Sequence, residues 1–166
     1  MAKTSGGLRG GSSDVTPTEA SAKISQIIAD IQSKGYSSEQ PFSIGKVDSE
    51  MIEYAKNNGI TLASDDIYMS AAQIGHTLRD SKVESDIAIS ASHLEEFPLR
   101  RSSMELYHDK SNRNFVYFDR ERSEKFVIHP NYSMKISKKK TTKVNYITAS
   151  KTDSREFNMR KYTKIK

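Results

Sequence analysis

Hydrophobic and polar residues alternate along four segments in the second half of the chain. These segments, which all lie within residues 102–150, read SSMELYHD, NFVYFDRE, SEKFVIHPNYSMKI and KVNYITAS. In the second segment, Phe115 and Tyr117 fall on the opposite side from Val116, because side chains alternate along a strand. The separators DKSNR, RERSE and SKKKTT are polar and typical of turns. The pattern predicts four short antiparallel strands with one face on a core.

The first half of the chain carries a helical pattern. TPTE (16–19) reads as a capping box with proline at the first helical position, and Gly35 suits the helix end. Apolar residues follow at the spacing of one helix face: Ala20, Ile24, Ile27, Ile28 and Ile31. We expect this stripe to pack on the core, and a partner-binding face is the alternative. The division expected is a flexible Gly/Ser-rich tail or linker (1–15), an amphipathic helix (16–40) and an α+β nuclease-like domain (41–166).

Shorter elements are expected between this helix and the four strands. FSIGKV (42–47) is a candidate strand, and ITLASDDIYMS (60–70) is a strand or a bent extended segment. The segment between them predicts a helix that turns Met51, Ile52 and Ala55 inward.

Two further helices and an undecided end complete the expected layout. A second capping box at SAAQ (70–73) opens a helix through about Lys82, and SASHLEEF is a helix that ends at Pro98. The segment after residue 150 is a helix or a strand, with Phe157 and Tyr162 as anchors. The fold class predicted is therefore α+β, with N-terminal helices packed on a twisted antiparallel sheet of about four strands.

Charge is distributed unevenly around the net value of +5. Residues 100–166 hold 18 Lys and Arg against 7 Asp and Glu, a net of +11, whereas residues 1–99 hold 8 against 14, a net of −6. A basic half is typical of a protein that binds a phosphate backbone. A solvated surface, or one that meets an acidic protein, is the alternative.

Composition excludes several classes of function. The chain has no cysteine, which excludes disulfides, thiolate zinc sites and a cysteine nucleophile. No apolar run approaches the ~18 residues that a membrane span needs, so no membrane association is expected. The N-terminal MAKTSGGLRGG lacks the apolar region of a secretory signal.

The histidines limit the chemistry that the chain could perform. They stand at 76, 93, 108 and 129, a spacing that matches no local metal-binding pattern, so no metal or other cofactor is expected. Metal-free cleavage of RNA needs a histidine to move protons, a cation to neutralise the phosphorane and groups that fix the phosphate. The 2′-OH of RNA is itself the nucleophile.

Candidate catalytic residues come from a helix and from the last strand. His76 lies on the opposite side of its helix from Ile74, and Arg79 shares the side of His76. The alternative for this face is a solvated helix surface. In the last strand, Val144, Tyr146 and Thr148 share one parity, and Asn145, Ile147 and Ala149 share the other. Neither set is uniformly polar, so the exposed side of this strand stays open.

Thr148 is the candidate hydroxyl, with the role of an ordinary strand former as its alternative. Candidate substrate-binding residues are Lys143 for phosphate, Tyr117 and Tyr146 for stacking on bases, and also Asn145 and Arg120. The tyrosines could equally be core residues.

The order of motifs resembles the phage-encoded nuclease domains of the barnase–EndoU–colicin–RelE-like (BECR) superfamily. The motifs are DIYMSAAQIGHTLRD, AISASHLEEFPLRRSSMELYHD, NFVYFDRE, KFVIHPNY and KVNYITAS, and they cover roughly residues 40–166. The resemblance implies helices on a four-stranded antiparallel sheet and a metal-independent ribonuclease without a cofactor. It also implies a toxin or effector carried by phages or mobile elements, and it matches His76 and Thr148 to catalytic positions.

The leading hypothesis is therefore an endoribonuclease that cleaves RNA by 2′-OH attack, with tRNA among the candidate substrates. The expected partners are RNA and an immunity protein or a fused phage virion protein. The expected place of action is the cytoplasm of a bacterial host. Delivery with a phage particle is one expected route to it. The alternatives are a non-catalytic nucleic-acid-binding or phage structural module, and a protein whose basic sheet binds an acidic protein.

Overall fold

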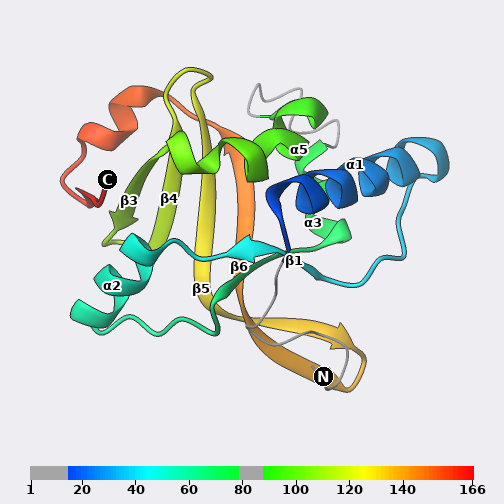
Figure 1. Cartoon of the computed structure of the whole chain (residues 1–166), viewed down its shortest axis with the longest axis horizontal. Helices are drawn as coiled ribbons and strands as arrows, with labels where there is room; N and C mark the ends of the chain where they lie inside the picture. Colours follow the sequence, from blue (N-terminus) through cyan, green and yellow to red (C-terminus); the bar gives the residue numbers. More distant parts are fainter. Residues whose placement is uncertain (1–14, 79–87) are drawn as a thin grey trace.

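The computed structural model describes residues 15–78 and 88–166 (Figure 1). The helices and strands, in chain order, are α1 (Pro17–Lys34), β1 (Phe42–Lys46), α2 (Ser49–Asn57), β2 (Asp66–Met69), α3 (Ala71–Leu78), α5 (Ala91–Arg100), η1 (Arg101–Ser103), β3 (Glu105–Asp109), β4 (Asn114–Asp119), β5 (Glu124–Ser137), β6 (Lys140–Lys151), η2 (Ser154–Asn158) and β7 (Tyr162–Lys164). The predicted tail (1–15) lies outside the described residues except for Val15.

The sheet is larger than the sequence predicted and is mixed. The described residues form seven strands in the order β1-β2-β6-β5-β4-β3-β7. The four predicted segments form β3 to β6, which pair antiparallel with their neighbours. β7 adds beside β3, and the pair β1–β2 adds beside β6, with β2 parallel to β6 through Ile67↔Asn145 and Tyr68↔Tyr146.

The predicted fold of a four-stranded antiparallel sheet is therefore wrong, although the class stays α+β. The candidate strands within 42–47 and 60–70 are present as β1 and β2. With five, four and three residues, however, β1, β2 and β7 are too short for their patterns to show that they join the sheet. The parallel pairing of β2 with β6 joins segments that are distant in the sequence, and no local pattern reports such a pairing.

α1 begins and ends as its sequence predicts. Thr16 Oγ1 accepts from the Glu19 amide, and the Glu19 carboxylate accepts from the Thr16 amide, which completes the capping box. Gly35 ends the helix with φ +86°, a left-handed conformation that glycine adopts without a Cβ clash. Its apolar stripe joins the main core, which also receives side chains of α2, α3, α5 and one face of the sheet. Figure 1 shows α5 crossing the central strands with α1 beside it.

α5 continues past the residue where we expected it to end. Pro98 lies inside the helix, which extends to Arg100, so the predicted end at Pro98 is wrong. Proline lacks the N–H that would bond one turn back, but only two helical residues follow it, so the loss falls on the last turn. α3 is described as far as Leu78, and the rest of the helix predicted to reach Lys82 lies outside the described residues.

The face of the sheet that points away from α1, α3 and α5 is only partly covered. At one end η2 places Phe157 against Tyr107 and Phe118, with ring centroids 4.7 and 4.4 Å apart. Tyr162 of β7 joins this cluster, so both predicted anchors of the C-terminal segment are confirmed. No helix within residues 15–78 and 88–166 covers the rest of this face, and we call it the open face.

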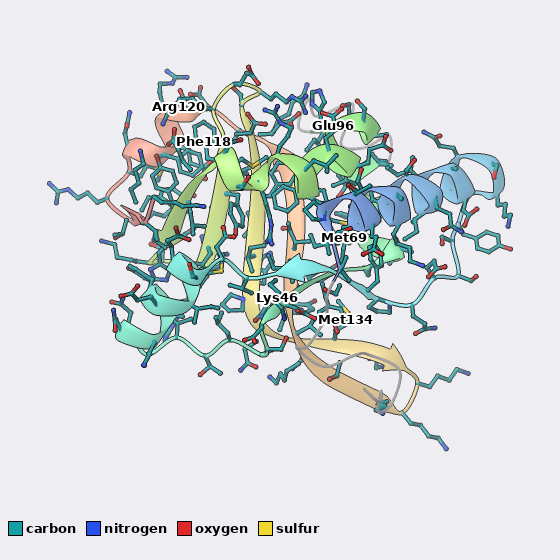
Figure 2. The ribbon with its side chains drawn as sticks, in the orientation of Figure 1. Lys46, Met69, Glu96, Phe118, Arg120 and Met134 are labelled. Atoms are coloured by element: carbon teal, nitrogen blue, oxygen red, sulfur yellow. The ribbon has the colours of Figure 1, made fainter. Side chains whose placement is uncertain are left out.

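β5 and β6 extend beyond the body of the sheet as a long hairpin, whose distal part (132–144) we call the arm. Its start is marked by a bulge, because pairing shifts from His129↔Tyr146 to Tyr132↔Val144, and Asn131 takes φ +55° there. Asparagine tolerates this left-handed backbone better than most residues. Figure 2 shows Met134 of the arm in the lower part of the molecule and Arg120 near the top.

None of the helices within residues 15–78 and 88–166 combines the length and the apolar character that a bilayer crossing needs.

Candidate active site on the open face of the sheet

A groove of about 420 Å³ runs over the open face of β3 to β6. Pairing in register places Tyr107, Val116, Val127 and Thr148 side by side across the four strands. The groove is lined by Asp109, Asn112, Asn114, Val116, Lys125, Val127, His129, Thr148, Lys161 and Tyr162. Polar and ionisable side chains therefore gather on one face, around an apolar floor of two valines.

An imidazole and a hydroxyl meet in this groove. His129 follows Val127 by two residues on β5, so it points to the same face, and its Nε2 lies 3.1 Å from Thr148 Oγ1 on β6. Burial lowers the pKa of His129 below its usual 6.5. The imidazole is therefore neutral at neutral pH, and one of its ring nitrogens can accept a proton.

Two lysines supply positive charge at the edge of the groove, and both are paired. Lys125 Nζ lies 2.8 Å from a Glu156 carboxylate oxygen, and Lys161 Nζ lies 3.1 Å from Asp109 Oδ2. The pKa of Asp109 is lowered by hydrogen bonds from Asn112 and Lys161, which outweigh its burial. Both carboxyls thus stay ionised and hold the ammonium groups in place.

Asn114 adds a polar atom that the fold leaves without use. Its Oδ1 is buried and has no hydrogen-bond partner among the described residues. A buried carbonyl oxygen without a donor costs free energy. A ligand in the groove that carries a hydroxyl or amine could satisfy it.

Tyr146 connects the groove to α3. Its hydroxyl donates to Gln73 Oε1 (3.1 Å) and lies 3.2 Å from Ser70 Oγ at the start of the helix. Burial raises the pKa of Tyr146, so the hydroxyl keeps its proton and its contacts. The ring stacks on Tyr132 with centroids 5.0 Å apart and planes tilted by 20°. The predicted substrate-binding residue Tyr146 therefore does lie on the open face, with its hydroxyl already bonded.

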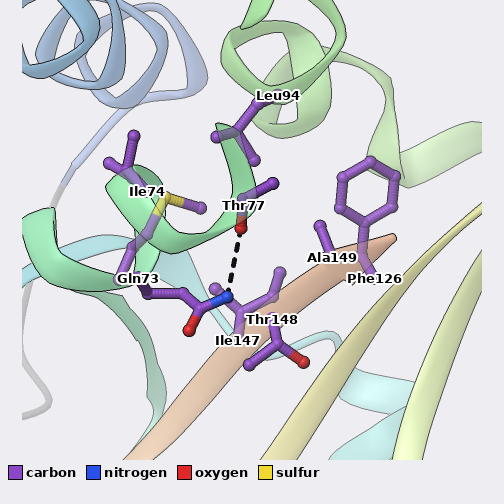
Figure 3. A pocket seen from close by; sticks show the side chains of 9 residues that line it. Gln73, Ile74, Thr77, Leu94, Phe126, Ile147, Thr148 and Ala149 are labelled. Atoms are coloured by element: carbon purple, nitrogen blue, oxygen red, sulfur yellow. Dashed lines mark hydrogen bonds between the residues drawn. The ribbon is translucent and has the colours of Figure 1, made fainter. Parts of the chain in front are cut away.

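His76 lies on α3, half-buried, and not on the strands that carry His129 and Thr148. The side chains that link α3 to β6 come from Ser70 and Gln73, which contact Tyr146, and Gln73 also donates to Thr77 Oγ1 (Figure 3). The space between α3, α5 and β6 is only about 10 Å³, about enough for a single water molecule. The proposed partner of His76, Arg79, lies outside the described residues.

Asn145 has a structural position. It is fully buried; its Oδ1 accepts from the amides of Ala63 and Asn131, and its Nδ2 donates to the carbonyls of Ser64 and Asp66. These four bonds tie the loop before β2 and the bulge of β5 to β6. The side chain has no capacity left for substrate.

Tyr117 is also committed to the fold. Its ring is fully buried against Phe97, with centroids 5.6 Å apart, and its hydroxyl donates to Asp48 Oδ2 at 2.7 Å. Burial raises its pKa well above the usual value. The structure therefore places Tyr117 under the helices and away from the groove.

Of the three predicted cations, the two within the described residues lie far apart. Arg120 is exposed, contacts Glu105 at 2.7 and 2.9 Å and lies over the Phe118 ring. Lys143 is exposed on the arm, opposite Ser133. Of the eight site residues predicted, the structure thus brings Thr148 and Tyr146 to the open-face site.

The remaining two histidines have contacts within the fold. His93 Nδ1 lies 2.6 Å from the buried Glu124 carboxylate, and His108 Nδ1 lies 3.1 Å from the Tyr54 hydroxyl. His129 was the functional candidate missed by the sequence analysis. The available signal was that His129 lies two residues after Val127, which places both side chains on the same face of β5. Pro130, which follows His129, indicated the bulge in this strand.

No protein-family model, curated protein or solved structure matches this chain. Across residues 15–78 and 88–166, no cluster of three or more His, Asp or Glu side chains could hold a metal ion.

Proposed function

We propose that this protein is a metal-independent endoribonuclease whose reaction takes place in the open-face groove. The observation that carries the proposal is the pair His129 Nε2–Thr148 Oγ1, 3.1 Å apart, in a groove lined by two lysines. The motif resemblance to BECR nucleases supports the choice of RNA and of a phage or mobile-element toxin acting in a bacterial cytoplasm.

His129 acts as the general base in the proposed reaction. The neutral imidazole accepts the proton of a ribose 2′-OH, whose oxygen attacks the adjacent phosphorus and displaces the 5′ oxygen. Thr148 orients the imidazole or a phosphate oxygen, and the ammonium groups of Lys125 and Lys161 stabilise the negative charge that develops. The 5′ oxygen leaves with a proton, for which these ammonium groups are the donors in the groove. The products are a 2′,3′-cyclic phosphate and a 5′-hydroxyl.

A pair of histidine variants tests the proposal. The protein is incubated with total RNA and with tRNA in EDTA, and the RNA ends are analysed for 2′,3′-cyclic phosphate. His129→Ala is expected to slow cleavage by roughly 100-fold or more, whereas the matched control His76→Ala keeps wild-type cleavage. Circular dichroism checks that both variants are folded. Absence of cleavage by the wild type, or cleavage that survives His129→Ala, contradicts the proposal; loss in His76→Ala alone moves the site to α3.

A non-catalytic nucleic-acid-binding module is the second candidate. The observation that favours it is the pairing of both groove lysines with carboxylates, which reduces the charge they offer to a transition state. It predicts salt-dependent RNA binding without any turnover.

A further inference from the structure

The arm (132–144) is strongly cationic. It carries five lysines and no Asp or Glu: Lys135, Lys138, Lys139, Lys140 and Lys143, all of them exposed. The arm projects beyond the body of the sheet (Figure 1), so these charges lie on a projecting element. A chain of phosphates is the partner that such a row of ammonium groups fits.

The base of the arm is anchored by an apolar cluster. Met134 and Val144 of the arm are buried with Tyr68 of β2, and Tyr146 packs against them. The bulge that starts the arm is held by the bond from the Asn131 amide to Asn145 Oδ1. The lysines are thus presented on a fixed support beside the groove.

Tyr132 joins the arm to the groove. It is 45% exposed, although one side of its ring stacks on Tyr146. Its centroid lies 6.3 Å from that of His129. An exposed aromatic ring next to the catalytic imidazole offers a stacking surface for a planar group at the reaction centre.

We propose that the arm and Tyr132 bind single-stranded RNA, with phosphates along the lysines and one unstacked base on Tyr132. The phosphodiester beside that base then lies at His129. This inference deepens the proposed ribonuclease function by naming its substrate as unpaired RNA.

The combination of features selects unpaired RNA. In a duplex every base is stacked on its neighbours and has no free face for Tyr132. An acidic protein could neutralise the lysines, but it would supply no planar base to stack on the ring beside His129. A single strand uses both the charges and the ring.

Binding to a fully 2′-O-methylated RNA oligonucleotide tests the inference, because this RNA lacks the nucleophile and stays intact. Affinity is measured by fluorescence anisotropy as a function of salt, for the single strand and for its duplex. Five lysine–phosphate contacts give a slope of log affinity against log salt of about −3.5. Lys138→Gln with Lys140→Gln should reduce this slope by about 1.4, whereas the matched pair Lys34→Gln with Lys56→Gln, on α1 and α2, should leave it unchanged.

Tyrosine variants test the stacking step. Tyr132→Leu keeps an apolar contact for Tyr146 but loses the ring, and it should weaken single-strand binding by roughly tenfold. Tyr132→Phe should bind as the wild type does. Duplex binding should be weaker and should not respond to either change.

Several results would overturn the inference: an unchanged affinity of Tyr132→Leu, an unchanged salt slope of the arm variant, or equal binding of duplex. Displacement of the RNA by polyglutamate of equal charge would instead mark the arm as a surface for an acidic protein. Failure of the proposed ribonuclease function can be told apart from failure of this inference. In that case the methylated RNA binds as expected, but unmodified RNA is not cleaved. Conversely, if the arm variants cleave RNA as the wild type does, the proposed binding of RNA by the arm is wrong, and the proposed ribonuclease function is unaffected.

Discussion

The two sides of β6 use their polar residues differently. On the helix-covered side, Asn145 makes four hydrogen bonds within the fold, next to the buried Ile147. On the open side, Thr148 bonds a histidine that keeps a second ring nitrogen, and the neighbouring Asn114 has an unused oxygen. A polar residue in a sheet is therefore best judged by its spare hydrogen-bonding capacity, because burial alone does not separate structure from function.

A matched pair of asparagine substitutions should give the largest difference between the two sides. Asn145→Ala leaves two amides and two carbonyls without partners, and we expect it to lower the free energy of unfolding by about 3–5 kcal/mol. Asn114→Ala removes an oxygen without a partner and should cost less than about 1 kcal/mol. Urea unfolding measures both. Equal losses would show that the two faces do not differ in this way.

Thr148→Val sharpens the comparison on the open side. The substitution preserves shape but removes the hydroxyl that contacts His129, so we expect RNA cleavage to fall by roughly 10-fold or more. The unfolding free energy should change by less than about 1 kcal/mol, because one partly exposed hydrogen bond is lost. Initial rates on tRNA, together with urea unfolding, separate the two effects. Wild-type cleavage by the valine variant would remove Thr148 from the mechanism.

The pH dependence of cleavage and of stability should reflect the lowered pKa of His129 on the open side. Because burial lowers the pKa of His129, the acid limb of kcat/KM should have its midpoint below 6.5, and cleavage should fall as the imidazole gains a proton. The unfolded chain has a histidine pKa near 6.5, so it binds the proton first. Stability is therefore lost as the pH falls from about 6.5 toward the lowered folded value.

His129→Gln should remove part of this acid-induced loss of stability, and the remainder includes His108, whose pKa burial also lowers. Cleavage rates and urea unfolding midpoints are measured from pH 4 to pH 8, at pH values roughly one unit apart. An acid limb above 6.5 would assign the titration to another group.

Arg120→Gln should have the smallest effect. Its guanidinium is bonded to Glu105 at the far end of the open face, where it lines a different hollow from that of His129. Cleavage of tRNA and the melting temperature should both match the wild type within error. A tenfold loss of cleavage would extend the substrate path to that end of the sheet.

The sequence predicted the parts of the fold that depend on contacts between residues close together in the chain. The capping box and apolar stripe of α1, and the alternation in β3 to β6, reflect contacts within a helix or along a strand. The parallel pairing of β2 with β6 depends on the whole sheet, so the sequence did not reveal it.

The candidate site was predictable only in part for the same reason. Thr148 was selected as a hydroxyl on a strand, but its partner depended on the pairing Val127↔Thr148, which no spacing along the chain reports. Asn145 and Tyr117 had suitable chemistry for binding, and only the hydrogen bonds that they make in the folded chain show that this chemistry is already used.

β6 holds a central place in the sheet, between β2 from the first half of the chain and β5 from the second. Synthesis proceeds from the N-terminus, so β2 must wait for roughly eighty further residues before its parallel neighbour exists. Neither side of the sheet can close until residues 140–151 have been made. The contact between His129 and Thr148 therefore cannot form before residues 140–151 have been synthesised and have paired with β5.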